Sequence, residues 1–259
     1  MKITCLLENT SSRPNILPQH GMSLWIETEN HRILFDMGQT DLFAQNAERL
    51  GIDLKTADIA VLSHGHYDHG GGLSHFLSIN ATTPIYLSKY AFGEFYNGEE
   101  KYIGLDASLQ GNSRLILTDG ETKIAENLTL HSCNHLPRPN SLGCFGLTHR
   151  GKDGSLADDP FLHEQYLLIE ENGKRVLVSG CSHKGILDIA EWFTPDVLVG
   201  GFHVSKMPLD ASLDRVAQTL NKQKTTYHTC HCTGQEQYAF MKQSMKNLHY
   251  LSSGETIEL

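Results

Sequence analysis

One short stretch constrains the fold of this chain more than any other. The segment Ser63–Gly72 (SHGHYDHGGG) directly follows the apolar run Ile59–Leu62 (IAVL). An apolar run of this length before a glycine-rich segment is typical of a buried strand that ends in a loop. Functional side chains gather on such loops, so we expect the chain to be organised around this one.

The residue types in this segment are those that bind transition metals. Imidazole and carboxylate groups together suit a borderline divalent ion such as zinc, manganese or iron. On an extended or turning backbone, His64, His66 and Asp68 alternate sides and cannot all reach one ion. We therefore predict two adjacent ions, the first on His64 and His66 and the second on Asp68 and His69. The alternative, a run of surface histidines, is disfavoured by the density of ligand-type residues.

Three later stretches complete a pattern that resembles a known family. They are Ser179–Ile186 (SGCSHKGI), Gly200–His203 (GGFH) and His231–Gly234 (HCTG). With the H-x-H-x-D-H segment they resemble the metallo-β-lactamase superfamily, in the branch named after 7,8-dihydropterin-6-methyl-4-(β-D-ribofuranosyl)aminobenzene 5'-phosphate synthase. The motifs run from residue 63 to residue 234, so the resemblance covers nearly the whole chain. It implies an α+β fold, a four-layer αββα sandwich, with residues 1–259 as a single domain.

The resemblance also implies further ligands. Superfamily members often have an aspartate after the strand that Val176–Val178 matches, bridging the two ions, and Cys181 stands in its place. A thiolate is a good zinc ligand, although a small buried apolar role is the alternative. His231 matches the last superfamily ligand, on the second ion. Cys230 and Cys232 flank His231 and, as its neighbours in an extended chain, are expected to point away and pack.

The third ligand of the first ion stays open. The superfamily places a histidine near residues 131–135, and both His131 and His135 are present, but the expected Pro-Gly-His type of turn is absent. His183, on the same predicted loop as Cys181, is our first choice for this ligand, and His135 is the second.

Substrate contacts are defined less sharply. His203 ends another predicted strand on the same rim, after two glycines that would let a ligand approach closely. We expect it to contact a phosphate or carboxylate of a substrate. The nearby cations are Lys184, Lys206, Arg138 and Arg150, and their spacing does not rank them.

The predicted chemistry uses two divalent ions, with zinc preferred and manganese or iron as alternatives. Ions about four ångströms apart would hold a bridging hydroxide and polarise the bond under attack. Asp68 is placed to ligate and to orient the water, and is the catalytic candidate. Asp36 is either a group beneath the metal loop or a turn-capping aspartate. We predict a metal-dependent hydrolase, or a related transferase, on a small anionic substrate; the resemblance implies one that contains phosphate or pterin.

Three other functions are compatible with this fold: a nuclease, a ligand sensor with little turnover, and a di-iron redox protein. The formal net charge of −9 disfavours a nucleic-acid partner. The complete H-x-H-x-D-H segment disfavours a sensor, and no flavin partner segment supports a redox protein. No stretch approaches the roughly 20 apolar residues of a membrane span. Six cysteines with no paired framework or secretion signal favour a reducing cytoplasm, and nothing indicates the oligomeric state.

Local patterns predict elements that alternate in the second half of the chain between strand and helix. Strands are expected at 2–7, 22–28, 31–36, 59–62, 84–87, 114–118, 122–125, 128–132, 165–170, 175–179, 196–200 and 224–228, and helices at 40–50, 73–79, 184–193, 210–220 and 235–246. Residues 88–113 are expected to form either an aromatic insertion beside the site or a satellite packing cluster. Residues 137–160 are expected to be a long loop that covers the site.

Overall fold

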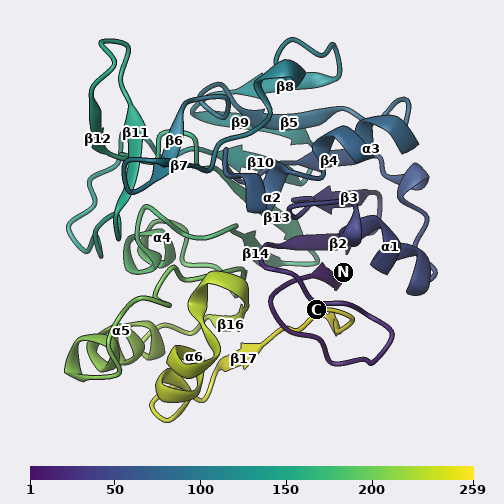
Figure 1. Ribbon diagram of the computed structural model, residues 1–259. Helices are drawn as coiled ribbons and strands as arrows, with labels where there is room; N and C mark the ends of the chain where they lie inside the picture. Colours follow the sequence, from purple (N-terminus) through teal and green to yellow (C-terminus); the bar gives the residue numbers. More distant parts are fainter.

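Two seven-stranded sheets form the centre of the computed structural model, which describes residues 1–259 (Figure 1). The strands of the first sheet are, in chain order, β1 (Lys2–Leu7), β2 (Ser23–Glu27), β3 (Arg32–Phe35), β4 (Ile59–Val61), β5 (Ile85–Ser88), β8 (Leu115–Thr118) and β18 (Thr256–Glu258). They lie in the order β18-β1-β2-β3-β4-β5-β8. β3 and β4 are parallel, so their carboxyl ends meet at the same edge of the sheet.

The second sheet has the same number of strands. They are β9 (Glu121–Ala125), β10 (Leu128–His131), β13 (Tyr166–Glu171), β14 (Lys174–Val178), β15 (Val197–Val199), β16 (Thr226–Thr229) and β17 (Leu248–Tyr250). Their order is β17-β16-β15-β14-β13-β10-β9. β14, β15, β16 and β17 pair in parallel. The loops that follow β14, β15 and β16 therefore gather at one edge of this sheet.

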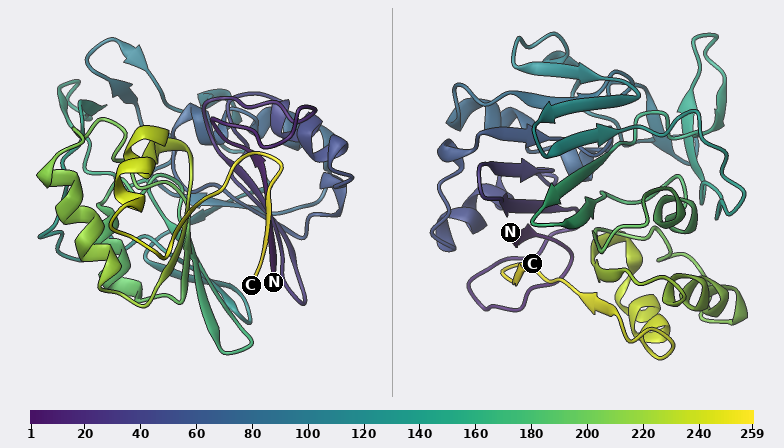
Figure 2. Two further views of the ribbon diagram at one scale, coloured as in Figure 1. Left: turned by 90° about the horizontal axis from the view of Figure 1, so that it is seen from below. Right: turned by 180° about the vertical axis from the view of Figure 1, so that it is seen from behind.

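Helices cover the outer face of each sheet, which confirms the predicted αββα sandwich. They are α1 (Leu42–Arg49), α2 (Tyr67–Gly70), α3 (Leu73–Ile79), α4 (Ile186–Phe193), α5 (Ala211–Asn221) and α6 (Gln235–Lys242), with 3-10 turns η1 (Leu54–Thr56), η2 (Ala107–Leu109) and η3 (His231–Thr233). The left view of Figure 2 shows α4 to α6 on one side of the paired sheets and α1 and α3 on the other. None of these helices meets the length and apolarity that a membrane crossing requires.

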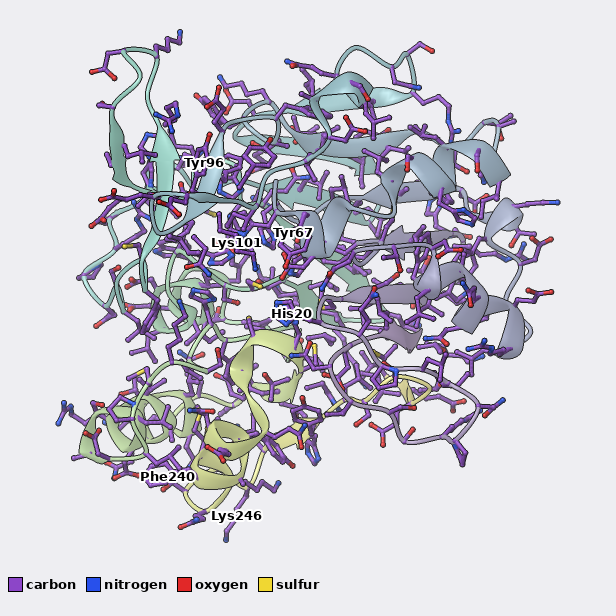
Figure 3. All side chains as sticks on the ribbon, viewed as in Figure 1. His20, Tyr67, Tyr96, Lys101, Phe240 and Lys246 are labelled. Carbon is purple, nitrogen blue, oxygen red and sulfur yellow. The ribbon has the colours of Figure 1, made fainter.

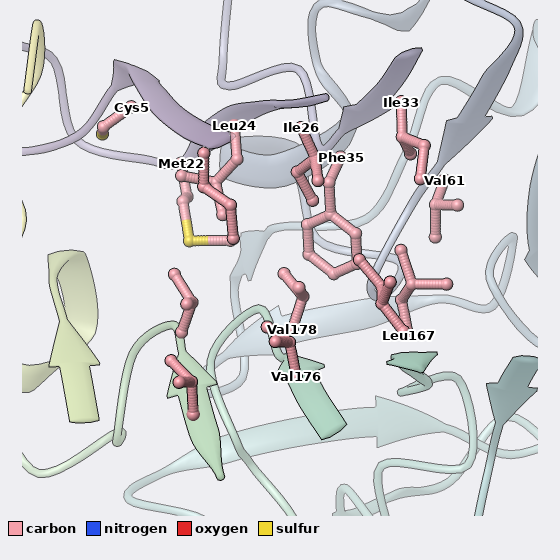
Figure 4. Close-up of a cluster of buried hydrophobic side chains, with 14 of the residues drawn as sticks. Cys5, Met22, Leu24, Ile26, Ile33, Phe35, Val61, Leu167, Val176 and Val178 are labelled. Carbon is pink, nitrogen blue, oxygen red and sulfur yellow. The ribbon is translucent and has the colours of Figure 1, made fainter. Parts of the chain in front are cut away.

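The main core lies between the two sheets (Figure 4). Phe35 and Val61 from the first sheet face Leu167, Val176 and Val178 from the second, and all five are buried. Alternate residues of each strand point to opposite faces, so the intervening side chains pack beneath the helices in two further clusters. Burying each such side chain stabilises the fold by roughly 1.5–3 kcal/mol, which holds the strand ends in fixed positions.

A small third sheet projects from this body at the upper left of Figure 1. Its strands are β6 (Phe95–Asn97), β7 (Lys101–Tyr102), β11 (Leu147–Arg150) and β12 (Leu156–Asp158), in the order β12-β11-β6-β7. The prediction of an unstructured loop over 137–160 is wrong, because that segment contains the β11–β12 hairpin. The hairpin is ordered by pairing with the distant strand β6, a contact that no local pattern reveals.

Candidate metal centre

The segment Ser63–Gly72 passes directly above the end of β3. Asp36, at that strand end, is fully buried and has a φ of 59°. One carboxylate oxygen accepts a hydrogen bond from the Ser63 backbone N–H at 2.7 Å, and the other accepts from the Ser63 hydroxyl at 2.7 Å. The second oxygen also lies 2.6 Å from His69 Nδ1. Asp36 thus lies beneath the loop, and its bond to Nδ1 leaves the Nε2 of His69 facing Cys181.

His69 and Cys181 bring the two halves of the molecule into contact. His69 Nε2 lies 3.2 Å from Cys181 Sγ. Burial alone lowers the pKa of His69, but the Asp36 carboxylate outweighs burial and raises that pKa to about 9. Cys181 is buried, yet it belongs to none of the apolar core clusters. Its placement therefore differs from that of a cysteine that only fills core space.

Three histidines from two loops form an imidazole group. His64 Nε2 lies 3.3 Å from His183 Nε2, and one ring nitrogen from each of His64, His66 and His183 lies within 4.8 Å of the others. Burial lowers the pKa of all three rings, that of His66 to about 3. The rings are therefore neutral at neutral pH, the form that binds a metal ion. His66 Nε2 is buried without a hydrogen-bond partner, and a divalent ion would satisfy it.

A second group surrounds Asp68. Its Oδ2 lies 3.4 Å from His231 Nε2 and 3.1 Å from His20 Nε2. Burial opposes ionisation of Asp68, but the hydrogen bonds with His20 and His231 hold the pKa of its carboxyl well below the usual value. His231 Nδ1 accepts from the Gly21 backbone N–H at 3.3 Å and lies 2.8 Å from Asn9 Oδ1, so Nε2 is the nitrogen that faces Asp68. His20 precedes β2 and belongs to no motif, so the sequence offered no signal for it.

The residues given as alternatives for the third ligand lie in different places. His183 lies beside His64, as described above, whereas His135 is exposed and joins no such group. His131 is half-buried and faces Glu121 at 3.7 Å. The structure therefore brings His183, and not His135 or His131, to the first pair of histidines.

His203 lies at the same edge. Its ring centre is 4.2 Å from that of His183, and both of its ring nitrogens are buried without partners. The two preceding glycines serve a different purpose from the one predicted. A Cβ on Gly200 would stand 2.0 Å from the Ser179 carbonyl oxygen, and one on Gly201 would stand 2.3 Å from Cys232 Sγ. They make room for protein atoms rather than for a ligand.

Two anchoring residues were missed in the sequence. Glu164 is fully buried, and its carboxylate accepts from the backbone N–H of His183 at 2.7 Å, from that of Lys184 at 3.0 Å and from the Tyr166 hydroxyl at 2.6 Å. His163 accepts from the Gly65 N–H at 3.0 Å. Both residues precede β13 and belong to no motif, yet between them they hold the two loops that carry the imidazole group.

The cysteines on either side of His231 separate. Cys230 packs in the core between the sheets, as predicted. The prediction that Cys232 also packs away from the site is wrong, because its side chain lines the cavity. His231 has a φ of 48°, a left-handed conformation that breaks the alternation of an extended chain.

Members of both ligand groups line one cavity of about 250 Å³, with His64 and His69 fully buried behind them. Its lining includes Asn9, His20, His66, Tyr67, Asp68, Asn97, Lys101, Ile103, Leu147, Cys181, His183, His203, Ser205, Lys206, His231, Cys232 and Gly234. Figure 3 shows His20, Tyr67 and Lys101 near one another on this face. Asn97, Lys101 and Ile103 come from the insertion at 88–113, whose Phe95 packs in a satellite cluster. Residues 88–113 therefore lie partly beside the site and partly in a satellite packing cluster, so each of the two predicted alternatives holds for part of the insertion.

The four predicted cations differ in whether their side chains reach the cavity. Lys206 lines the cavity and donates to the Phe145 carbonyl at 2.8 Å. Lys184 is buried and turned inward, where its Nζ donates to the carbonyl oxygens of Ser132 and Glu164. Arg138 and Arg150 do not line the cavity. Lys101, which is not among the four predicted cations, also lines the cavity.

Comparison with known proteins assigns the family. Residues 17–220 match the family model described as the metallo-β-lactamase superfamily. This chain belongs to the metallo-β-lactamase superfamily. It is similar to an uncharacterised protein of Methanocaldococcus jannaschii, with 30% identity over 246 residues and 90% of each chain covered.

Two further relatives carry descriptive names. The 7,8-dihydropterin-6-methyl-4-(β-D-ribofuranosyl)-aminobenzene-5'-phosphate synthase of M. jannaschii is 27% identical over 275 residues, covering 93% of this chain and 90% of the relative. A solved structure described as a metal-dependent hydrolase of the β-lactamase superfamily is 30% identical, with a TM-score of 0.85 and coverage of 100% of this chain and 99% of the other. The predicted superfamily and branch are thus supported, and the superfamily is one of metal-dependent hydrolases.

Proposed function

We propose that this superfamily member is a dinuclear metal-dependent hydrolase that acts on a small anionic substrate. The observation that carries the proposal is the meeting of two ligand groups in one cavity. His64, His66 and His183 would hold one ion, and a second group of four would hold the other. That second group consists of Asp68, His69, Cys181 and His231. Zinc suits a set of imidazole, carboxylate and thiolate ligands, with manganese or iron as alternatives.

When bound, such ions supply Lewis acidity and lower the pKa of a coordinated water. The chain's own residues prepare the site for this chemistry. Asp36 holds His69 by Nδ1, so His69 would bind an ion through Nε2 once that nitrogen has given up its proton. Asp68 stays a carboxylate, because its hydrogen bonds with His20 and His231 outweigh burial, so it is suited to ligate and to orient a water.

Two features support a small anionic substrate. Lys101 and Lys206 both line the cavity, and neither is ion-paired with a carboxylate, whereas Lys2 and Lys89 are. A lysine with no carboxylate partner is available to bind a phosphate or carboxylate of a ligand. One relative is named as the synthase of a ribofuranosyl phosphate that also contains a pterin. We therefore propose a phosphate- or pterin-containing compound as the substrate class, with His203 contacting its anionic group.

Metal analysis and turnover assays test the proposal. Gently purified protein should contain close to two divalent ions per chain, and it should hydrolyse members of a panel of phosphoesters and lactones. Asp68→Ala should lower kcat by about 100-fold or more, with little change in the urea midpoint. Asp119→Ala, at an exposed carboxylate outside the cavity, is the matched control.

The outcomes separate this proposal from the alternative of a ligand sensor. Protein that holds two ions but hydrolyses no member of the panel would favour the sensor. Protein that takes up neither zinc nor manganese would overturn the hydrolase and would likewise favour a sensor that keeps the fold. Wild-type turnover by Asp68→Ala would remove Asp68 from the catalytic machinery.

A further inference from the structure

Cys232 takes no part in the ligand groups described above, yet it lies among them. Its side chain is 8% exposed and lines the cavity, whereas Cys230 lies in the core between the sheets. The left-handed turn at His231 separates the two. The sulfur of Cys232 thus reaches the cavity from the same short turn that carries His231.

The distances around this sulfur are those of a ligand set. Cys232 Sγ, Cys181 Sγ and a ring nitrogen of His231 all lie within 4.8 Å of one another. Two sulfurs that each bind a tetrahedral zinc at about 2.3 Å lie roughly 3.8 Å apart, which falls inside this spacing. The three side chains come from two loops, after β14 and β16, whose positions the parallel strands fix.

The backbone around Cys232 is shaped to hold a sulfur there. The His203 N–H donates to Cys232 Sγ at 3.3 Å, and such a bond stabilises and orients a thiolate. Gly201 leaves the space, because a Cβ at that position would stand 2.3 Å from the sulfur. The Cys232 thiol also donates to the Cys181 carbonyl oxygen at 3.4 Å, a bond that would be lost when the thiol gives up its proton to a metal ion.

We propose that Cys232 is a direct ligand of the second ion, together with Cys181 and His231. This inference rests on the metal binding in the proposed function and adds a ligand to it. Coordination converts each thiol to a thiolate and releases its proton to solvent. A second thiolate beside the imidazole and carboxylate ligands already proposed would make this site select zinc, cadmium or cobalt over manganese or magnesium, which prefer oxygen ligands.

Cobalt(II) provides a direct count of thiolate ligands in the full-length chain. Metal-free protein is reconstituted with Co(II), and the near-ultraviolet sulfur-to-cobalt charge-transfer absorption is measured per bound ion. Cys181→Ser and Cys232→Ser should each lose about half of that absorption. Cys230→Ser, at the core cysteine on the other side of His231, should keep all of it. Cys232→Ser should also bind Cd(II) at least tenfold more weakly, while its affinity for Mn(II) changes much less.

A second measurement keeps the test valid if a variant fails to fold. X-ray absorption of the wild-type zinc protein should give an average of one sulfur per zinc, because both sulfurs would bind the second of the two ions and neither would bind the first. An average of one half, or a full cobalt band in Cys232→Ser, would overturn the inference while leaving the proposed function intact. Failure of the wild-type chain to bind cobalt or zinc would instead overturn both.

Discussion

In the N-terminal half of the molecule, a single loop after β4 carries His64, His66, Asp68 and His69. In the C-terminal half, the cavity residues are dispersed over the ends of β14, β15 and β16. The first arrangement is contiguous in sequence, and the second exists only because three parallel strands end at one edge. The two halves therefore reach the same cavity by different structural means.

The buried carboxylates that hold the ligand residues in place also differ between the two halves. Asp36 contacts the ring of His69 directly, so it controls which nitrogen faces Cys181. Glu164 contacts the backbone of His183 and Lys184, so it acts on a ligand only by holding its loop. The ligands of the N-terminal half are therefore controlled through the chemistry of a ligand ring, and those of the C-terminal half through the position of their loop. Substitutions at these supports test that distinction.

The largest effect is expected from Asp36→Asn. The substitution keeps the side-chain volume but leaves a buried amide facing Ser63 and His69, and it removes one partner of a buried charge pair. We expect the metal-free protein to lose roughly 3–5 kcal/mol of unfolding free energy in urea, and the second ion to be lost. Asp158→Asn, at an exposed aspartate of strand β12, should change neither quantity. Two retained ions and an unchanged urea midpoint would refute a direct role for Asp36.

A smaller effect is expected from Glu164→Gln. The glutamine keeps one oxygen acceptor, but its amide group must face a backbone N–H that Glu164 now satisfies. We expect a loss of roughly 1–3 kcal/mol in urea unfolding, with first-site zinc affinity about 10-fold weaker and the second site retained. Glu170→Gln, at an exposed carboxylate of the strand β13 that follows Glu164, is the control. Equal loss of both ions would show that the two halves do not act separately.

A change of about 1 kcal/mol in unfolding free energy is expected when the pH is lowered, because of His228 on strand β16 of the C-terminal sheet. Burial, with a smaller contribution from the stacked His249, lowers the pKa of His228 to about 4. Between about pH 6.5 and pH 4 the unfolded chain binds this proton and the folded chain does not, so stability falls as pH falls through that window. Partial exposure reduces the size of the effect. From pH 7 to pH 5, His228→Gln should lose about 1 kcal/mol less unfolding free energy than wild type; an identical loss would contradict this.

The smallest effect is expected from His135→Ala. His135 is exposed and lies outside the ligand groups, so the urea midpoint should correspond to a change within about 0.5 kcal/mol. Zinc content should stay at the wild-type value. Loss of one ion would mean that the loop containing His135 reaches the site when metal binds, and the choice of His183 would have to be reconsidered.

Much of the architecture could be predicted from local sequence. The hairpin of β2 and β3, the helix α3 over Leu73–Ile79 and the alternation of strand and helix after β14 all follow from short patterns of apolar residues. The H-x-H-x-D-H segment located the centre of the site, because its ligands are neighbours in the chain. These features depend on residues a few positions apart, which sequence patterns report directly.

The remaining features were decided by contacts between distant segments. The β11–β12 hairpin forms because β11 pairs with β6, and His20 and Glu164 reach the site from segments without any motif. The left-handed backbone at His231 turns Cys232 into the cavity, against the alternation expected of an extended chain. Local sequence sets which residue types are available as ligands and where the strands end. Only tertiary packing decided which of those ends meet and which side chains turn inward, because these depend on backbone conformation and pairings set by the whole core.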